Sequence, residues 1–138
     1  METENVTKTR NGVAIRHERH SLTITHCGLE IIASQLLCEE SDEFVIALFG
    51  NKTLSFQREY IKPEVPEEFI SKDPDDPPAD VQAAISFSKG FFITKDFYDG
   101  GPYMGIWNSQ KDILFAIEDE TNYDRIDAFI KAIKLFLQ

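Results

Sequence analysis

Residues 84–117, AISFSKGFFITKDFYDGGPYMGIWNSQKDILFAI, decide the fold class of this chain. Apolar segments in this stretch predict strands at 84–88, 91–97, 103–107 and 113–117. Turn-forming residues separate the segments at Lys89-Gly90, at 99–102 and at 108–112. Strands at such short and regular spacing indicate an antiparallel meander.

The segment after the meander predicts a C-terminal amphipathic helix. Its apolar residues recur at helical spacing, at Ile126, Phe129, Ile130, Ile133, Phe136 and Leu137. Thr121 is the expected N-cap residue, and Asp127 and Lys131 lie where they favour the helix dipole. The expected fold class is therefore α+β, with an antiparallel sheet meander packed by this helix.

The N-terminal half is less regular. Residues 1–12 are expected to form a flexible polar arm. Alternating apolar residues over 13–18 and 21–26 predict either two short strands or one long bent strand. Residues 29–38 fit both the helical and the strand period, and we expect a second helix there. After an acidic loop at 39–43, a β-hairpin is expected from strands at 44–49 and 53–61.

Residues 62–80 are expected to form a loop, because five of the six prolines lie there. The same stretch holds seven acidic residues against two lysines. A chain of 138 residues fits one domain, so we expect a single α+β domain over 13–138 that carries this Pro- and acid-rich loop.

The net charge of −10 limits the classes of partner. It works against binding to nucleic acid and to an anionic membrane surface, and it favours a basic protein partner through electrostatic steering. The chain shows no signal-type apolar segment, and Cys27 and Cys38 are expected to stay reduced. We therefore expect a soluble, cytoplasmic protein.

Residues with catalytic chemistry form no known pattern. His17, His20 and His26 lack the spacing of a zinc site, and Cys27 would face away from His26 on a strand. The glycine-rich Asp99–Gly105 segment lacks the phosphate-binding patterns. We expect no enzyme, no catalytic residue, no metal and no cofactor. The alternative is a small enzyme in which the His17–His26 segment meets the Asp99–Gly105 loop in a pocket.

Three acidic clusters lie at Glu39–Glu43, in the 64–80 loop and at Glu118–Glu120. If they converge, they form a negative surface that covers a basic site of a partner. Tyrosine and tryptophan are enriched at the energetically dominant positions of interfaces, which makes Tyr60, Tyr98, Tyr103 and Trp107 the candidate aromatic anchors. The predicted contact residues are Asp73, Asp75, Asp76, Asp80, Glu118, Asp119, Glu120, Tyr103 and Trp107.

In its size, its acidity and its lack of catalytic motifs, the chain resembles the small acidic immunity proteins that neutralise bacterial toxins, nucleases especially. The resemblance implies a protein-binding inhibitor that occludes the basic active site of one cognate toxin with carboxylates. One alternative binder is a small acidic secretion chaperone, usually a dimer, that holds a segment of an effector. Another is a phage-encoded inhibitor of a nucleic-acid-binding defence complex.

Overall fold

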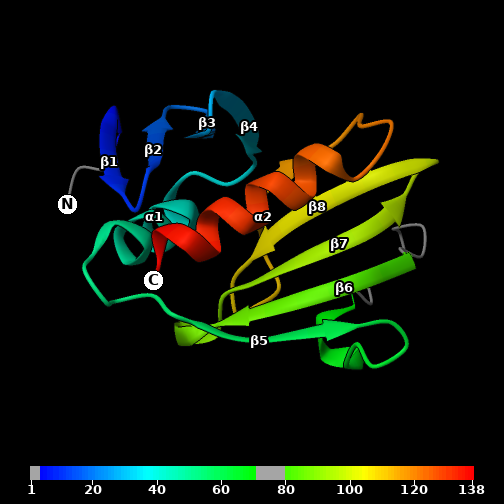
Figure 1. Ribbon diagram of the computed structural model, residues 1–138. Helices are drawn as coiled ribbons and strands as arrows, with labels where there is room; N and C mark the ends of the chain where they lie inside the picture. The colour runs from blue at the N-terminus through cyan, green and yellow to red at the C-terminus, as the bar shows by residue number, and fades with distance from the viewer. Residues whose placement is uncertain (1–3, 71–79) are drawn as a thin grey trace.

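The computed structural model describes residues 4–70 and 80–138, and these form an α+β fold (Figure 1). Within those residues the strands make one nine-stranded antiparallel sheet in the order β1-β2-β3-β4-β9-β8-β7-β6-β5. The predicted meander and the predicted C-terminal helix are therefore confirmed. The strands are β1 (Val6–Arg10), β2 (Val13–Glu18), β3 (Ser21–His26), β4 (Leu29–Gln35), β5 (Phe56–Ile61), β6 (Asp80–Phe87), β7 (Phe92–Tyr98), β8 (Gly101–Trp107) and β9 (Ile113–Ile117).

Two meanders share this sheet. Strands β1 to β4 form one and strands β5 to β9 form the other, and they join where Ser34 and Gln35 of β4 pair with Ala116 and Phe115 of β9. Helix α1 (Glu39–Phe49) follows β4 and leads to β5 at the far edge. Helix α2 (Asp124–Phe136) lies across one face of the sheet, with β1–β4 on one side of it and β5–β8 on the other (Figure 1).

The core is rich in phenylalanine. The fully buried rings include Phe44 of α1, Phe115 of β9, and Phe129 and Phe136 of α2. Phe44 packs edge-on against Phe91, with 5.3 Å between ring centroids. Each such ring removes about 150–250 Å² from water, so these contacts from both helices and the sheet dominate the stability of the fold.

Helix α2 forms because its apolar residues fall on one stripe, and Ile126, Phe129, Ile133 and Phe136 are all fully buried. The predicted cap at Thr121 is wrong. The helix begins at Asp124, whose N–H donates to the side-chain oxygen of Asn122 at 2.9 Å. An asparagine side-chain oxygen readily accepts a hydrogen bond from the backbone N–H two residues on, and this contact fixes the chain where the helix starts.

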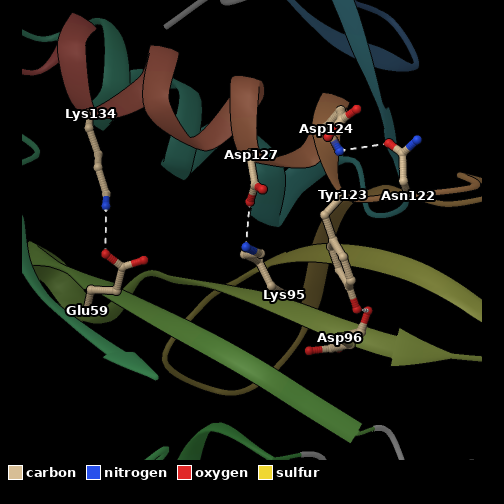
Figure 2. A network of polar contacts seen from close by, with 8 residues as sticks. All are labelled: Glu59, Lys95, Asp96, Asn122, Tyr123, Asp124, Asp127 and Lys134. Carbon is tan, nitrogen blue, oxygen red and sulfur yellow. Dashed lines mark hydrogen bonds and ion pairs between the residues drawn. The ribbon is translucent and has the colours of Figure 1, made fainter. Parts of the chain in front are cut away.

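Polar contacts tie one side of α2 to the sheet (Figure 2). Lys95 of β7 reaches Asp127 with Nζ and Oδ1 2.5 Å apart, and Lys134 reaches Glu59 of β5 at 3.1 Å. The Tyr123 hydroxyl donates to the main-chain oxygen of Asp96 at 2.8 Å (Figure 2). The helix therefore meets β5 and β7 through charged and polar groups and meets the core through its apolar stripe.

The predicted helix over 29–38 is wrong, because residues 29–35 form strand β4. Ile31 and Ala33 are buried while Ile32 and Ser34 are exposed, which is the strand period. The β-branched pair Ile31-Ile32 suits this half-buried, pleated surface.

The predicted strand over 44–49 and the predicted loop over 39–43 are also wrong, because both lie in α1. The acidic residues Glu39, Glu40 and Asp42 occupy the first turn, where the helix dipole favours negative charge. Of the predicted hairpin over 44–61, only the second strand exists, as the edge strand β5.

Residues 6–10 of the predicted flexible arm form strand β1 instead, paired with β2 through a tight turn at Asn11 and Gly12. Arg10 anchors this strand, since its guanidinium donates to the carbonyl oxygen of Phe49 and lies 4.8 Å from the centroid of Phe136. Polar residues at an edge strand face water, so their polarity does not exclude a strand.

Of the predicted loop at 62–80, residues 67–69 form the short 3-10 helix η1, and Asp80 already belongs to β6. Residues 71–79 lie outside the described part of the chain. Among the described residues, no helix has the length and the apolar character needed to cross a bilayer.

Candidate functional site

A tight turn between β7 and β8 forms one side of the candidate site. Tyr98 pairs with Gly101, which leaves Asp99 and Gly100 as a two-residue turn with φ values of 51° and 84°. A turn with two positive φ angles matches the twist of the strands, and Asp-Gly is a favoured pair for it. The turn that the sequence predicted at 99–102 is thus confirmed, with its last two residues inside β8.

The loop after β9 forms the other side. Strands β8 and β9 are antiparallel neighbours, with Met104 paired to Ile117, so the start of β8 lies beside the end of β9. A Cβ atom on Gly101 would lie 3.3 Å from the carbonyl oxygen of Glu120, which shows how closely the two segments approach. Between them lies an open depression of about 180 Å³ lined by residues 98–103 and 118–120.

The depression is acidic. Asp99, Glu118 and Asp119 are exposed, and within residues 4–70 and 80–138 no cation pairs with any of them. Glu120 differs, because Arg125 lies 3.3 Å from its carboxylate. Carboxylates that line one depression without a cation leave a negative potential that an incoming guanidinium or ammonium group neutralises.

Two half-buried tyrosines accompany the carboxylates. The rings of Tyr98 and Tyr103 lie 5.4 Å apart, and both residues line the depression. Tyrosine offers apolar area, a hydroxyl group and a ring face that attracts cations. The depression therefore combines the negative charge and the aromatic surface that suit a basic side chain of a partner.

The structure brings together Tyr103, Glu118, Asp119 and Glu120 from the predicted contact set. Asp80 does not line the depression and forms an ion pair with Lys62 at 2.5 Å. The hydrogen bond from Lys62 also lowers the pKa of Asp80. The predicted residues Asp73, Asp75 and Asp76 lie outside the described residues.

Trp107 does not line the depression. Its indole N–H donates to the Thr94 hydroxyl at 2.9 Å, and its ring stacks on Phe92 at 6.1 Å. Successive side chains of a strand face opposite sides of the sheet. Lys95 reaches α2, so Thr94, the residue before it on β7, faces away from that helix. Trp107, which contacts Thr94, therefore lies on the sheet face opposite α2. Its observed contacts are structural, while its role at a partner interface stays a prediction.

Sequence reasoning offered Tyr98 as an aromatic anchor but missed Asp99 as a contact residue, although the signal was present. The predicted strands at 103–107 and 113–117 are consecutive in a meander, so the residues before the first and after the second lie at the same end. Of the three acidic clusters in the predicted convergence, only Glu118–Glu120 lines the depression among the described residues, and it does so with Asp99, which lay outside that prediction. The Glu39–Glu43 cluster lies instead in α1.

A buried carboxyl group lies behind the site. Asp96 pairs with Tyr103 across β7 and β8 and is only 4% exposed. The Thr94 hydroxyl donates to its Oδ2 at 3.3 Å, while Oδ1 has no hydrogen-bond partner in the described residues. Burial raises the pKa of Asp96 to about 7, and the negative charge of Asp80 makes a smaller contribution in the same direction. The hydrogen bond from Thr94 lowers this pKa and so acts against both.

The alternative enzyme site does not form in the depression. His17 is buried and contacts the side-chain oxygen of Gln35 at 2.7 Å, and His20 lies in the turn after β2. None of the three histidines lines the acidic depression or a second, more apolar one of about 350 Å³ between Glu43 and Phe91. Among the described residues, no three or more histidine, cysteine, aspartate or glutamate side chains are arranged so that they could hold a metal ion.

Comparisons with protein-family models, with curated proteins and with solved structures found no match to this chain. Its function is therefore inferred from its own residues, and the acidic depression is the feature with the most specific chemistry.

Proposed function

We propose that this chain is a protein-binding inhibitor that takes a basic side chain of its partner into the acidic depression. The observation that carries the proposal is the meeting of Asp99 with Glu118 and Asp119 beside Tyr98 and Tyr103. Three carboxylates without a described cation and two aromatic rings are what an arginine-rich or lysine-rich surface would complement.

The charge of the whole chain supports this binding mode. A net charge of −10 attracts a basic partner over distances of about one Debye length, which is about 8 Å at physiological salt. The local carboxylates then fix the orientation of the complex, since like charges at a wrong register would repel. Association is therefore expected to be fast at low salt and to slow as salt is added.

The proposed inhibition depends on the basic surface with which the partner enzyme holds its substrate. Enzymes that act on nucleic acids hold the phosphate backbone with lysine and arginine, so a carboxylate-rich protein that covers those residues blocks the substrate. This is the mode of action that the resemblance to immunity proteins implies. The proposed partner is therefore a basic toxin domain, with a nuclease as the first candidate.

The test is capture of a partner from the native source by three forms of the protein. The site variant carries Asp99→Asn, Glu118→Gln and Asp119→Asn, and the control carries three acid-to-amide changes at other exposed positions. The control positions are Glu40, Glu43 and Glu64. Both variants have the same net charge, so they separate the effect of the site from the effect of total charge.

The unmodified protein should capture one basic protein in a stoichiometric ratio. The site variant should bind it at least about tenfold more weakly, because several charge-assisted contacts are lost, and the control should retain most of the affinity. Equal weakening of both variants, or capture of no basic partner, would contradict the proposal. Added to the captured enzyme, the protein should also abolish its activity.

A further inference from the structure

The hairpin turn between β3 and β4 places a thiol beside an imidazole. His26 is the last residue of β3, and Cys27 and Gly28 form a two-residue turn with φ values of 51° and 77°. Side chains of neighbouring residues face opposite ways inside a strand, but the positive φ of Cys27 takes it out of that alternation. The Cys27 sulfur consequently lies 3.4 Å from Nε2 of His26.

The imidazole is oriented by a different hairpin. Nδ1 of His26 lies 3.2 Å from the carbonyl oxygen of Gly12, in the turn between β1 and β2. A carbonyl oxygen only accepts hydrogen bonds, so Nδ1 carries the proton in this contact. Nε2 of the neutral ring is then the acceptor that faces the thiol. A nucleophile, a base and a group that orients the base are therefore in contact.

The thiol is open to reagents. Cys27 is exposed and His26 is half-buried, so a small molecule in solvent can approach the sulfur while the base stays held in place. Cys38 is also an exposed, reduced cysteine, but in the described part of the chain it has no imidazole contact. The two cysteines thus offer a comparison within one molecule.

We propose that Cys27 is a nucleophilic modification site, with His26 as its base, and that its substrates are low-molecular-weight disulfides. Nε2 of His26 takes the thiol proton, and the sulfur of Cys27 attacks one sulfur of the disulfide. The disulfide bond breaks, a mixed disulfide forms on Cys27, and the leaving thiolate takes the proton back from His26. One disulfide and one thiol are consumed, and one mixed disulfide and one small thiol are formed.

This site is independent of the acidic depression, because none of its groups lines that depression. It supplies a reversible covalent change at the turn where the β3–β4 hairpin meets the β1–β2 hairpin. The proposal therefore stands or falls separately from the proposed binding of a basic partner.

The test uses His26→Asn in the full chain, with dithiodipyridine as the probe disulfide. The side-chain N–H of asparagine can keep the hydrogen bond to Gly12, so the turn is preserved while the base is removed. Modification of each cysteine is followed by mass spectrometry after cleavage at glutamate, which separates Cys27 from Cys38 at Glu30. The single-cysteine variants Cys27→Ser and Cys38→Ser confirm the assignment.

At neutral pH, Cys27 should react about tenfold or more faster in the unmodified protein than in His26→Asn, a gain at the low end of what a positioned base contributes. The rate at Cys38 should be the same in both proteins. Equal rates at Cys27 in both proteins would overturn the proposal. So would an equal change at both cysteines, because that result reports a general loosening of the fold.

Discussion

Asp96 is expected to cost the protein stability at neutral pH, and Asp96→Asn should remove that cost. The carboxyl group is 96% buried on the sheet face away from α2, and one of its oxygens has no described partner. Charges close to it do not compensate for burial, since Asp80 on β6 is also negative and Lys95 points to the opposite face. An asparagine has nearly the same shape and carries no charge, so it resembles the protonated acid.

The size of the effect follows from the pKa of about 7 in the folded state, compared with 3.8 as the ordinary value. A factor of ten in proton affinity corresponds to about 1.4 kcal/mol, so the ceiling is about 4 kcal/mol. Because the folded state holds this proton more tightly than the unfolded chain, the group's contribution to stability is full below about pH 4. It is lost as the pH rises to about 7 and stays constant above that.

The assay is urea unfolding of the native protein and of Asp96→Asn at pH 5 and at pH 8. The difference in unfolding free energy between the two proteins should grow by about 2–3 kcal/mol between these pH values, in favour of the variant. Asp119→Asn, at an exposed position, is the matched control and should show no such growth. A pH-independent difference for Asp96→Asn would refute the assignment of a raised pKa to this buried group.

Two further predictions concern backbone positions. Cys27→Asn should raise the unfolding free energy by about 0.5–1 kcal/mol, because asparagine tolerates the positive φ of this turn better than cysteine does. Thermal unfolding measures it, and an unchanged or lower Tm would contradict it. Gly105→Ala should lower the unfolding free energy by more than about 1 kcal/mol, because the new Cβ would lie 2.6 Å from the Trp107 indole nitrogen. Urea unfolding followed by tryptophan fluorescence measures that loss, and a neutral effect would show that the ring can move.

The C-terminal half was predictable because its signals agree with one another. Residues 113–117 form strand β9 at the predicted bounds, and the stripe from Ile126 to Phe136 is buried as the helical period predicts. Turn residues with positive φ, such as Asp99 and Gly100, separate the strands where the sequence indicates. Local propensity, periodicity and turn chemistry all favour the same structure there.

The region between Leu29 and Phe49 was not predictable by the same means. A short continuous apolar run such as Phe44 to Phe49 fits a buried strand and a buried helix equally well. Its hydrophobic period therefore does not distinguish the two. Its acidic flank was the more informative signal, because Glu39 and Glu40 lie in the first turn of α1, where the helix dipole favours negative charge. Weighing that flank against the apolar run would have predicted α1.

The acidic depression could have been predicted from the sequence, whereas the contact between Cys27 and His26 could not. The depression follows from strand order alone, since Asp99 and Glu118 lie at the same end of neighbouring antiparallel strands. The contact of Cys27 with His26 does not, because it requires a cysteine in a conformation that asparagine or glycine would more often occupy. The alternation of side chains along a strand predicted that Cys27 faces away from His26. That expectation was wrong, because β3 ends at His26 and Cys27 lies in the turn that follows.

Asp96 connects the stability of the fold to the candidate site. Packing alone would favour an apolar residue where a carboxyl group costs up to about 4 kcal/mol at neutral pH. Buried groups with strongly raised pKa values gather at functional sites, and Tyr103, the cross-strand partner of Asp96, lines the depression. If Asp96 serves the site, Asp96→Asn will stabilise the protein and weaken its binding to the proposed basic partner. If affinity is unchanged while stability rises, Asp96 has no part in binding, and the proposed binding depends on the exposed carboxylates of the depression alone.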